Sequence, residues 1–143
     1  MAKKIAWIVL MIVVSGLVAC GGSSSNNSTT STANDFVGAW NGSTLYSGQS
    51  WSTTLTLSSN LTGSYLIPAA GITHNLTTSC IVTNGTLSFN LPVSVEDASN
   101  GCTAWAVSCT GTLSNVKTKL SLTCSGLVCD GMPYSYTDVM TKQ

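Results

Sequence analysis

From about Asp35 onward, apolar and polar residues alternate along the chain with a period of two. The segment from Trp51 to Leu57 alternates in this way, and the run from Leu87 to Val95 repeats the pattern. Such alternation is typical of antiparallel strands with one buried and one hydrated face. The pair Asn84-Gly85 favours a two-residue hairpin turn. No segment carries the apolar stripe of an amphipathic helix.

The spacing of the turn signals predicts eight strands. They are expected at about 36–46, 49–58, 61–68, 75–83, 86–95, 102–113, 118–125 and 132–141. Short loops between sequential strands favour an up-and-down meander, and closing it into a barrel removes the exposed edges. The predicted fold class is therefore all-β, a single antiparallel up-and-down β-barrel, with a two-sheet β-sandwich as the alternative. The polar outer faces argue against a membrane-spanning barrel.

The first 34 residues follow a different pattern. Lys3 and Lys4 precede an apolar run from Ile5 to Ala19, which is the layout of a secretory signal peptide. The run is short for a membrane span, which needs about 20 apolar residues; an uncleaved N-terminal anchor is the alternative. Residues 21–34 are rich in Gly, Ser, Thr and Asn, so they are predicted to be a flexible linker. The predicted organisation is signal peptide 1–19, lipidated cysteine and linker 20–34, and all-β domain 35–143.

Leu17-Val18-Ala19-Cys20 resembles the lipobox of bacterial lipoproteins. The resemblance implies cleavage between Ala19 and Cys20, a diacylglyceryl group on the Cys20 thiol and acylation of the new amino terminus. Several acyl chains give essentially permanent membrane anchoring. Gly21 follows the cysteine where an Asp would signal inner-membrane retention, so the resemblance implies the outer membrane of the cell envelope.

Charged residues make up only 7% of the chain, with five lysines, no arginine and one histidine. This composition argues against nucleic-acid binding, which needs a basic face. It also leaves little material for acid–base or metal chemistry. The chain has no phosphate-binding loop and no nucleophile elbow. We therefore expect that the protein is not an enzyme and that it binds neither a cofactor nor a metal. The alternative of an enzyme would rest on Glu96, Asp138 and His74, with Glu96 in a predicted hairpin loop and His74 in the loop before the fourth strand.

Six cysteines are present, and the lipobox assigns Cys20 to the lipid. The others are Cys80, Cys102, Cys109, Cys124 and Cys129. An exported domain with this many cysteines is expected to form disulfides. Because five is odd, at least one cysteine stays unpaired within the chain. The spacing lies outside the usual structural zinc pattern.

The register of one hairpin predicts the pairing. If Leu113 faces Leu120, then Cys109 faces Cys124. The same register places Cys102 opposite Gly131, close to Cys129. We therefore predict the bridges Cys109–Cys124 and Cys102–Cys129, which leaves Cys80 as a buried free thiol on the fourth strand. The alternative is a Cys124–Cys129 bridge.

Gly38-Ala-Trp40 resembles the first-strand motif of lipocalins and avidins, which are small eight-stranded barrels that hold one ligand in the mouth. Leu61 to Tyr65, Thr103 to Trp105 and Thr137 to Lys142 are similar to avidin segments in order and location. The resemblance spans about 36–142. It implies a ligand pocket lined by Tyr65, Trp105 and Asp138, with Trp40 closing the barrel floor.

The chain also departs from both families. Lipocalins usually pack an Arg over the first-strand Trp, and this chain has no Arg. Avidins lack these cysteines, and the avidin aromatic cage has a further Trp where this chain has Leu127-Val128-Cys129. The resulting hypothesis is an envelope lipoprotein that binds a small apolar or amphipathic ligand, or an envelope partner, without catalysis. A structural or protein-interaction module with a filled barrel is the alternative.

Overall fold

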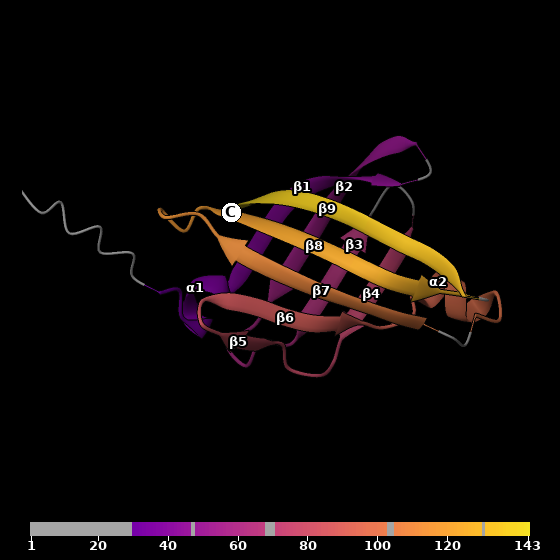
Figure 1. Ribbon diagram of the computed structural model, residues 1–143, viewed down its shortest axis with the longest axis horizontal. Coiled ribbons are helices and arrows are strands. Elements are labelled where there is room, and N and C mark those ends of the chain that lie inside the picture. Colours follow the sequence, from indigo (N-terminus) through magenta and orange to yellow (C-terminus); the bar gives the residue numbers. More distant parts are fainter. Residues whose placement is uncertain (1–29, 47, 68–70, 103–104, 130) are drawn as a thin grey trace, which may run out of the picture.

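The computed structural model describes residues 30–143, apart from 47, 68–70, 103–104 and 130. The lipobox, the predicted signal peptide and most of the predicted linker lie outside the described residues. One antiparallel sheet of nine strands and two short helices make up the described part of the chain (Figure 1). None of its helices has the length and apolar character needed to cross a membrane.

The elements follow one another in a simple order. They are α1 (Ala33–Phe36), β1 (Gly38–Tyr46), β2 (Gln49–Leu57), β3 (Gly63–Ile67), β4 (Ile72–Leu76), β5 (Ile81–Thr83), β6 (Thr86–Leu91), α2 (Val95–Ser99), β7 (Trp105–Leu113), β8 (Lys119–Val128) and β9 (Met132–Lys142). The prediction of an all-β, antiparallel, up-and-down domain is confirmed.

The strand order in the sheet is β4-β3-β2-β1-β9-β8-β7-β6-β5. The first and last strands join in the middle of the sheet, where Trp40 faces Lys142 and Asn41 faces Thr141. The two edges are therefore β4 and β5, which are consecutive in the chain. The sheet curls into a half-barrel (Figure 1), and its backbone ladder does not run from β4 to β5 among the described residues. It is one sheet, not the two sheets of a sandwich.

The predicted single strand over 75–83 is wrong, which is why the sheet has nine strands and not eight. Thr77 donates its backbone N–H to the Asn75 carbonyl at 3.0 Å, and this turn ends β4. The backbone N–H of Cys80 donates to the Leu61 carbonyl at 2.9 Å, before β5 begins. The prediction of a loop at His74 is also wrong, because His74 lies within β4.

Two short helices replace ends of predicted strands. β6 stops at Leu91 because the following Pro92 has no N–H to donate to a ladder. Ser94 then caps α2 by accepting a hydrogen bond from the Asp97 backbone N–H at 2.9 Å. Glu96, predicted to lie in a hairpin loop, is therefore helical. At the start of α1, the Thr32 backbone N–H donates to the Asp35 carboxylate at 2.7 Å. Because α1 ends at Phe36, the predicted first strand begins two residues late, at Gly38.

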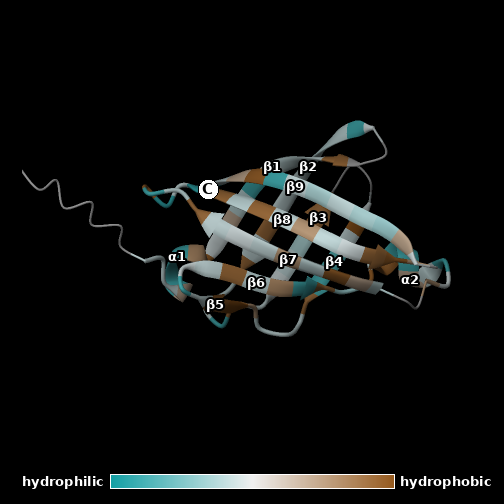
Figure 2. Ribbon diagram, in the orientation of Figure 1, coloured by the Kyte–Doolittle hydropathy of each residue, from teal (hydrophilic) through white to brown (hydrophobic). Residues whose placement is uncertain are grey.

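Alternate residues of each long strand face one shared interior, and hydrophobic and hydrophilic bands follow each other along the strands (Figure 2). Trp40 is fully buried and donates its indole N–H to the Phe36 carbonyl at 2.8 Å. The ammonium group of Lys142 lies 5.1 Å from the Trp40 ring centre. Lys117 forms an ion pair with Asp35 at 2.9 Å, and this contact lowers the Asp35 pKa to about 2. These contacts close the end of the half-barrel beside α1.

Both predicted disulfides are confirmed: Cys109–Cys124 and Cys102–Cys129. The register that predicted them is also present, since Leu113 faces Leu120 and Cys109 faces Cys124, the fifth of the nine residue pairs in the β7–β8 ladder. The alternative Cys124–Cys129 bridge is wrong. Among the described cysteines Cys80 is free and buried, and burial raises its thiol pKa to about 11.

Replacing Cys109 and Cys124 together by alanine is expected to lower the free energy of unfolding by about 3 kcal/mol. The bridge spans a sequence separation of 15 residues, and closing a loop of that length restricts the unfolded chain by about this amount. Urea denaturation at pH 7 measures the change. Cys80→Ala is the matched control, because it removes a buried sulfur without opening a bridge and should cost about 1 kcal/mol. Equal losses in the two variants would contradict the bridge.

Candidate functional site

Five aromatic side chains form a closed circuit inside the half-barrel. Its members are Tyr65 of β3, His74 of β4, Trp105 of β7, and Tyr134 and Tyr136 of β9. The ring centres of consecutive members lie 6.2, 5.5, 5.9, 5.4 and 5.9 Å apart, ending back at Tyr65. Aromatic pairs attract at such distances in stacked and edge-to-face arrangements. The circuit therefore links three separate parts of the sheet through side chains.

Asp138 is a fully buried carboxylate beside this circuit. Its Oδ1 accepts a hydrogen bond from the Ser43 backbone N–H at 3.0 Å. Its Oδ2 accepts from the hydroxyl groups of Thr53, at 2.5 Å, and Tyr65, at 3.1 Å. Gly42 makes room for the carboxylate, because a Cβ there would come within 2.4 Å of Oδ1. Three donors offset the loss of hydration that burial imposes on the carboxylate.

The Tyr65 hydroxyl is held in its protonated form. Burial raises the pKa of Tyr65 well above its usual value, and the nearby Asp138 carboxylate adds to the effect. Tyr65 therefore acts as a permanent hydrogen-bond donor to Asp138.

His74 is buried, and its Nδ1 lies 2.8 Å from the Pro92 carbonyl oxygen. A carbonyl oxygen only accepts hydrogen bonds, so Nδ1 carries the proton. Burial lowers the pKa of His74 below its usual value, against the opposing effects of the Pro92 hydrogen bond and of the Asp97 and Glu96 carboxylates. The imidazole is therefore neutral at pH 7. It ties β4 to the segment that follows β6.

The two edges of the sheet, β4 and β5, face each other without a backbone ladder among the described residues, and we call the gap between these edges the seam. A few separate hydrogen bonds connect the two sides of the seam. At one end, His74 bonds to Pro92, and the Thr73 backbone N–H donates to the Glu96 carboxylate at 3.1 Å. At the other end, Cys80 bonds to the Leu61 carbonyl. Between these ends the two sides of the seam separate.

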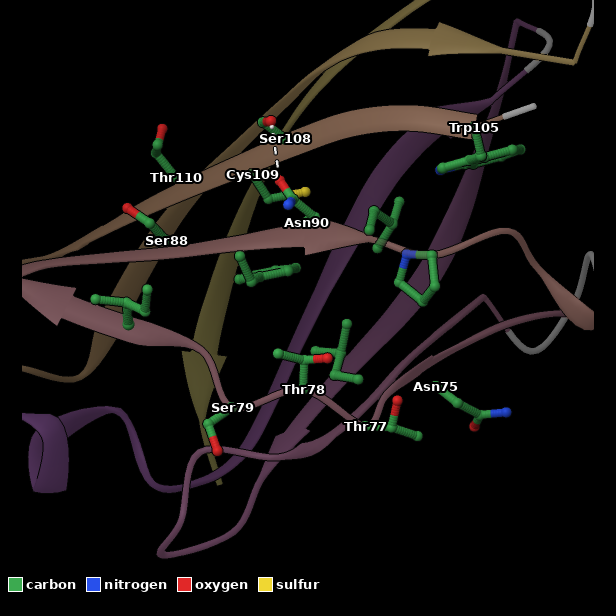
Figure 3. A pocket seen from close by; sticks show the side chains of 15 residues that line it. Asn75, Thr77, Thr78, Ser79, Ser88, Asn90, Trp105, Ser108, Cys109 and Thr110 are labelled. Atoms are coloured by element: carbon green, nitrogen blue, oxygen red, sulfur yellow. Dashed lines mark hydrogen bonds between the residues drawn. The ribbon is translucent and has the colours of Figure 1, made fainter. Parts of the chain in front are cut away.

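A pocket of about 490 Å³ lies in the seam (Figure 3). Its floor is apolar: Leu76, Leu91 and the disulfide-bonded Cys109 are buried, while Phe89 and Trp105 are half-buried. The pocket exists because β5 pairs only with residues 86–88 of β6. Residues 89–91 consequently have a partner strand, β7, on one side alone.

The rim of the pocket is polar and uncharged. It consists of the exposed side chains Asn75, Thr77, Thr78, Ser79, Asn90, Ser108 and Thr110. The Asn90 amide oxygen accepts a hydrogen bond from the Ser108 hydroxyl at 3.1 Å, as the dashed line in Figure 3 shows. None of the 15 residues that line the pocket is charged.

One polar atom of Trp105 lacks a hydrogen-bond acceptor among the described residues. Its indole nitrogen is buried and has no hydrogen-bond partner among the described residues. The Thr44 and Tyr136 hydroxyls share this condition, but only Trp105 also lines the pocket. In Figure 3 the nitrogen-bearing side of the ring is turned toward the other lining residues. An unpaired buried donor costs about 1–3 kcal/mol, so an acceptor placed here would be stabilising.

The four residues expected to form a ligand site lie in different surroundings. Tyr65 and Asp138 are hydrogen-bonded to each other, and Tyr65 is linked to Trp105 through His74. Trp40 lies at the α1 end. Of the four, Trp105 alone lines the seam pocket, so the ligand role of the others remains a prediction.

Sequence reasoning missed Phe89 and Asn90 as site residues. Both were placed correctly within a strand, but a strand residue becomes a site residue only where its neighbour strand is absent. The signal for that absence was the run Thr77-Thr78-Ser79, which interrupts the alternation of apolar and polar residues.

The residues of the enzyme alternative are engaged elsewhere. His74 is bonded to Pro92, Glu96 to Thr73, and Asp138 to its three donors. None of the three lines the pocket. Within the described ranges, no group of three His, Cys, Asp or Glu side chains is placed to hold a metal ion.

Comparison with known proteins gives no relative: no family model, curated protein or solved structure matches this chain.

Lowering the pH from 7 to 5 is expected to destabilise the fold through His74. Its pKa in the folded state lies below the unfolded value of about 6.5, so the unfolded chain binds the extra proton as the pH falls. Stability is therefore present above that value and is lost below it. At a slope of about 1.4 kcal/mol per pH unit, the loss at pH 5 is at most about 2 kcal/mol.

Urea denaturation between pH 7 and 5 measures this loss, and His74 is the single histidine of the chain. His74→Asn, which keeps a donor near the Nδ1 position and does not titrate, should flatten the profile. Glu96→Gln is the control and should keep the loss of stability at low pH, because the buried His74 imidazole is still present. An unchanged slope in His74→Asn would rule out His74 as the cause.

Proposed function

We propose that this protein is an exported envelope lipoprotein, anchored through Cys20, whose β domain binds a small amphipathic molecule without transforming it. The lipobox and the signal-peptide pattern support the anchor. The Cys102–Cys129 and Cys109–Cys124 bridges suit an oxidising compartment outside the cytoplasm. The half-barrel sheet supports the resemblance to lipocalins and avidins, whose small barrels hold one ligand.

The seam pocket is the observation that carries the binding proposal. Ligand pockets typically enclose 300–1,000 Å³, with an apolar lining and a few polar groups that fix orientation, and a pocket of about 490 Å³ lies within that range. The half-buried rings of Phe89 and Trp105 leave apolar surface for a ligand to cover. Apolar burial contributes about 25 cal/mol per Å², and association itself costs about 4–15 kcal/mol. To recover this cost, a ligand must contact both the apolar floor and the polar rim of the pocket.

A protein-interaction surface is the second candidate function. Leu127 and Met132 are 51% and 57% exposed beside the β8–β9 turn, and Leu45 is 69% exposed next to the β1–β2 turn. The interior is also filled by buried side chains such as Tyr65 and Met140. Both observations fit a module that acts through its outer surface.

The anchor proposal predicts that Cys20→Ala abolishes lipid attachment. In a bacterial host fed an alkyne-tagged palmitate, the wild-type chain should carry the label and fractionate with membranes. Cys20→Ala should lose essentially all label, because the acylated thiol is gone. Cys80→Ala is the control and should keep the label. Label that persists in Cys20→Ala would contradict the lipobox assignment.

The binding proposal predicts that the full chain, extracted from its envelope in lauryldimethylamine oxide, retains a small molecule in native mass spectrometry. Asn90→Trp should reduce the occupied fraction at least fivefold, because the larger ring fills the pocket. Asn41→Trp is the matched control: Asn41 is an exposed strand residue hydrogen-bonded to Thr54 at 3.1 Å, outside the pocket. A clean apo mass in the wild type would favour the interaction module.

A further inference from the structure

We infer that the seam pocket takes an uncharged, hydroxyl-rich ligand with an apolar face, which is the chemistry of a neutral saccharide. This inference rests on the proposed binding function and names its ligand class. Three features of the pocket lead to it: the absence of charge, the composition of the rim and the aromatic floor with its unpaired donor.

None of the described residues that line the pocket is charged. A carboxylate or phosphate ligand would lose hydration without gaining a cation, and an ammonium ligand would gain no carboxylate. The described lysines lie elsewhere: Lys117 and Lys142 both bind Asp35 at the α1 end, and Lys119 opens β8 next to them. The chain contains no arginine. A free fatty acid or a nucleotide is therefore a poor fit, and a neutral molecule is a good one.

The rim matches a ligand that both donates and accepts hydrogen bonds. Hydroxyl groups such as those of Thr78 and Ser108 do both, and the amides of Asn75 and Asn90 each supply two donors and an acceptor. Saccharide hydroxyls have the same dual character. A ligand that contacts both these side chains and the apolar floor must present polar groups along its edge and carbon-bound hydrogens on its face.

The aromatic floor supplies the matching apolar contact. Phe89 and Trp105 are half-buried and offer ring surface to the pocket. The face of an aromatic ring carries negative charge density, so it attracts the slightly positive C–H groups of a pyranose face. The buried indole N–H of Trp105 has no acceptor among the described residues. A hydroxyl or ring oxygen of a saccharide would fill that requirement.

Isothermal titration calorimetry of the full chain in lauryldimethylamine oxide tests the inference. The probes are three neutral tetrasaccharides (maltotetraose, cellotetraose and tetra-N-acetylchitotetraose) and one charged tetrasaccharide, tetragalacturonate. At least one neutral probe should bind measurably, at least tenfold more tightly than the charged probe. Asn90→Ala and Trp105→Phe should each weaken that binding about tenfold, the equivalent of one lost hydrogen bond.

Two controls match these variants. Asn41→Ala removes an amide hydrogen-bonded to Thr54 at 3.1 Å, as Asn90 is to Ser108, but outside the pocket. Trp51→Phe removes an indole N–H from a tryptophan that does not line the pocket. Both should bind as the wild type does. Equal binding by Asn90→Ala and wild type would place the saccharide elsewhere and overturn the inference.

The remaining outcomes separate the ligand class from the binding function. If no neutral probe binds and native mass spectrometry still finds a retained molecule without hydroxyl groups, the saccharide inference fails and the pocket proposal stands. If no probe binds and the wild-type chain has a clean apo mass, both fail.

Discussion

The hydrogen bond from the Cys80 amide to the Leu61 carbonyl, 2.9 Å long, holds the start of β5 against the β2–β3 connection. It draws residues 77–80 away from the line that β4 would otherwise follow. β5 is left with three residues, and the last half of β6 has no neighbour on that side. Had the strand continued, its backbone would cover Phe89 and satisfy the sheet edge. The interruption therefore creates both the open edge and the uncovered aromatic surface of the candidate site.

The sequence predicted the features that depend on local periodicity. Alternating residues from β7 and β8 fix which side chains face inward, and a single turn then fixes which residues face each other. The pairing of Cys109 with Cys124 follows from those two facts alone. The split at 77–80 depends instead on a contact with Leu61, which is distant in sequence. His74 was misplaced for the same reason, because its strand is defined by pairing with Tyr65 and not by its own neighbours.

Buried polar groups in the interior differ in whether the described residues give them hydrogen-bond partners. Asp138 is surrounded by three donors, and Gly42 leaves the space it occupies. Such a network fixes the relative positions of β1, β2, β3 and β9. Trp105 lacks a partner for its indole N–H, and it lies where the aromatic circuit meets the pocket. A rigid network beside the candidate pocket lowers the cost of ordering side chains when a ligand binds.

Because β1 pairs with β9, the same sheet could be formed by a chain whose ends lie at different strands. The backbone N–H of Gln143 donates to the Ala39 carbonyl at 3.0 Å, so the C-terminus lies directly beside the first strand. Read from β5 through β9 and then from β1 to β4, the strands follow their spatial order without a break. A circular permutant that joins residue 143 to residue 32 and begins at residue 81 would thus keep every ladder of the sheet. The β1–β9 junction lies in the middle of the sheet, and the seam lies where the ends of the permuted chain would be.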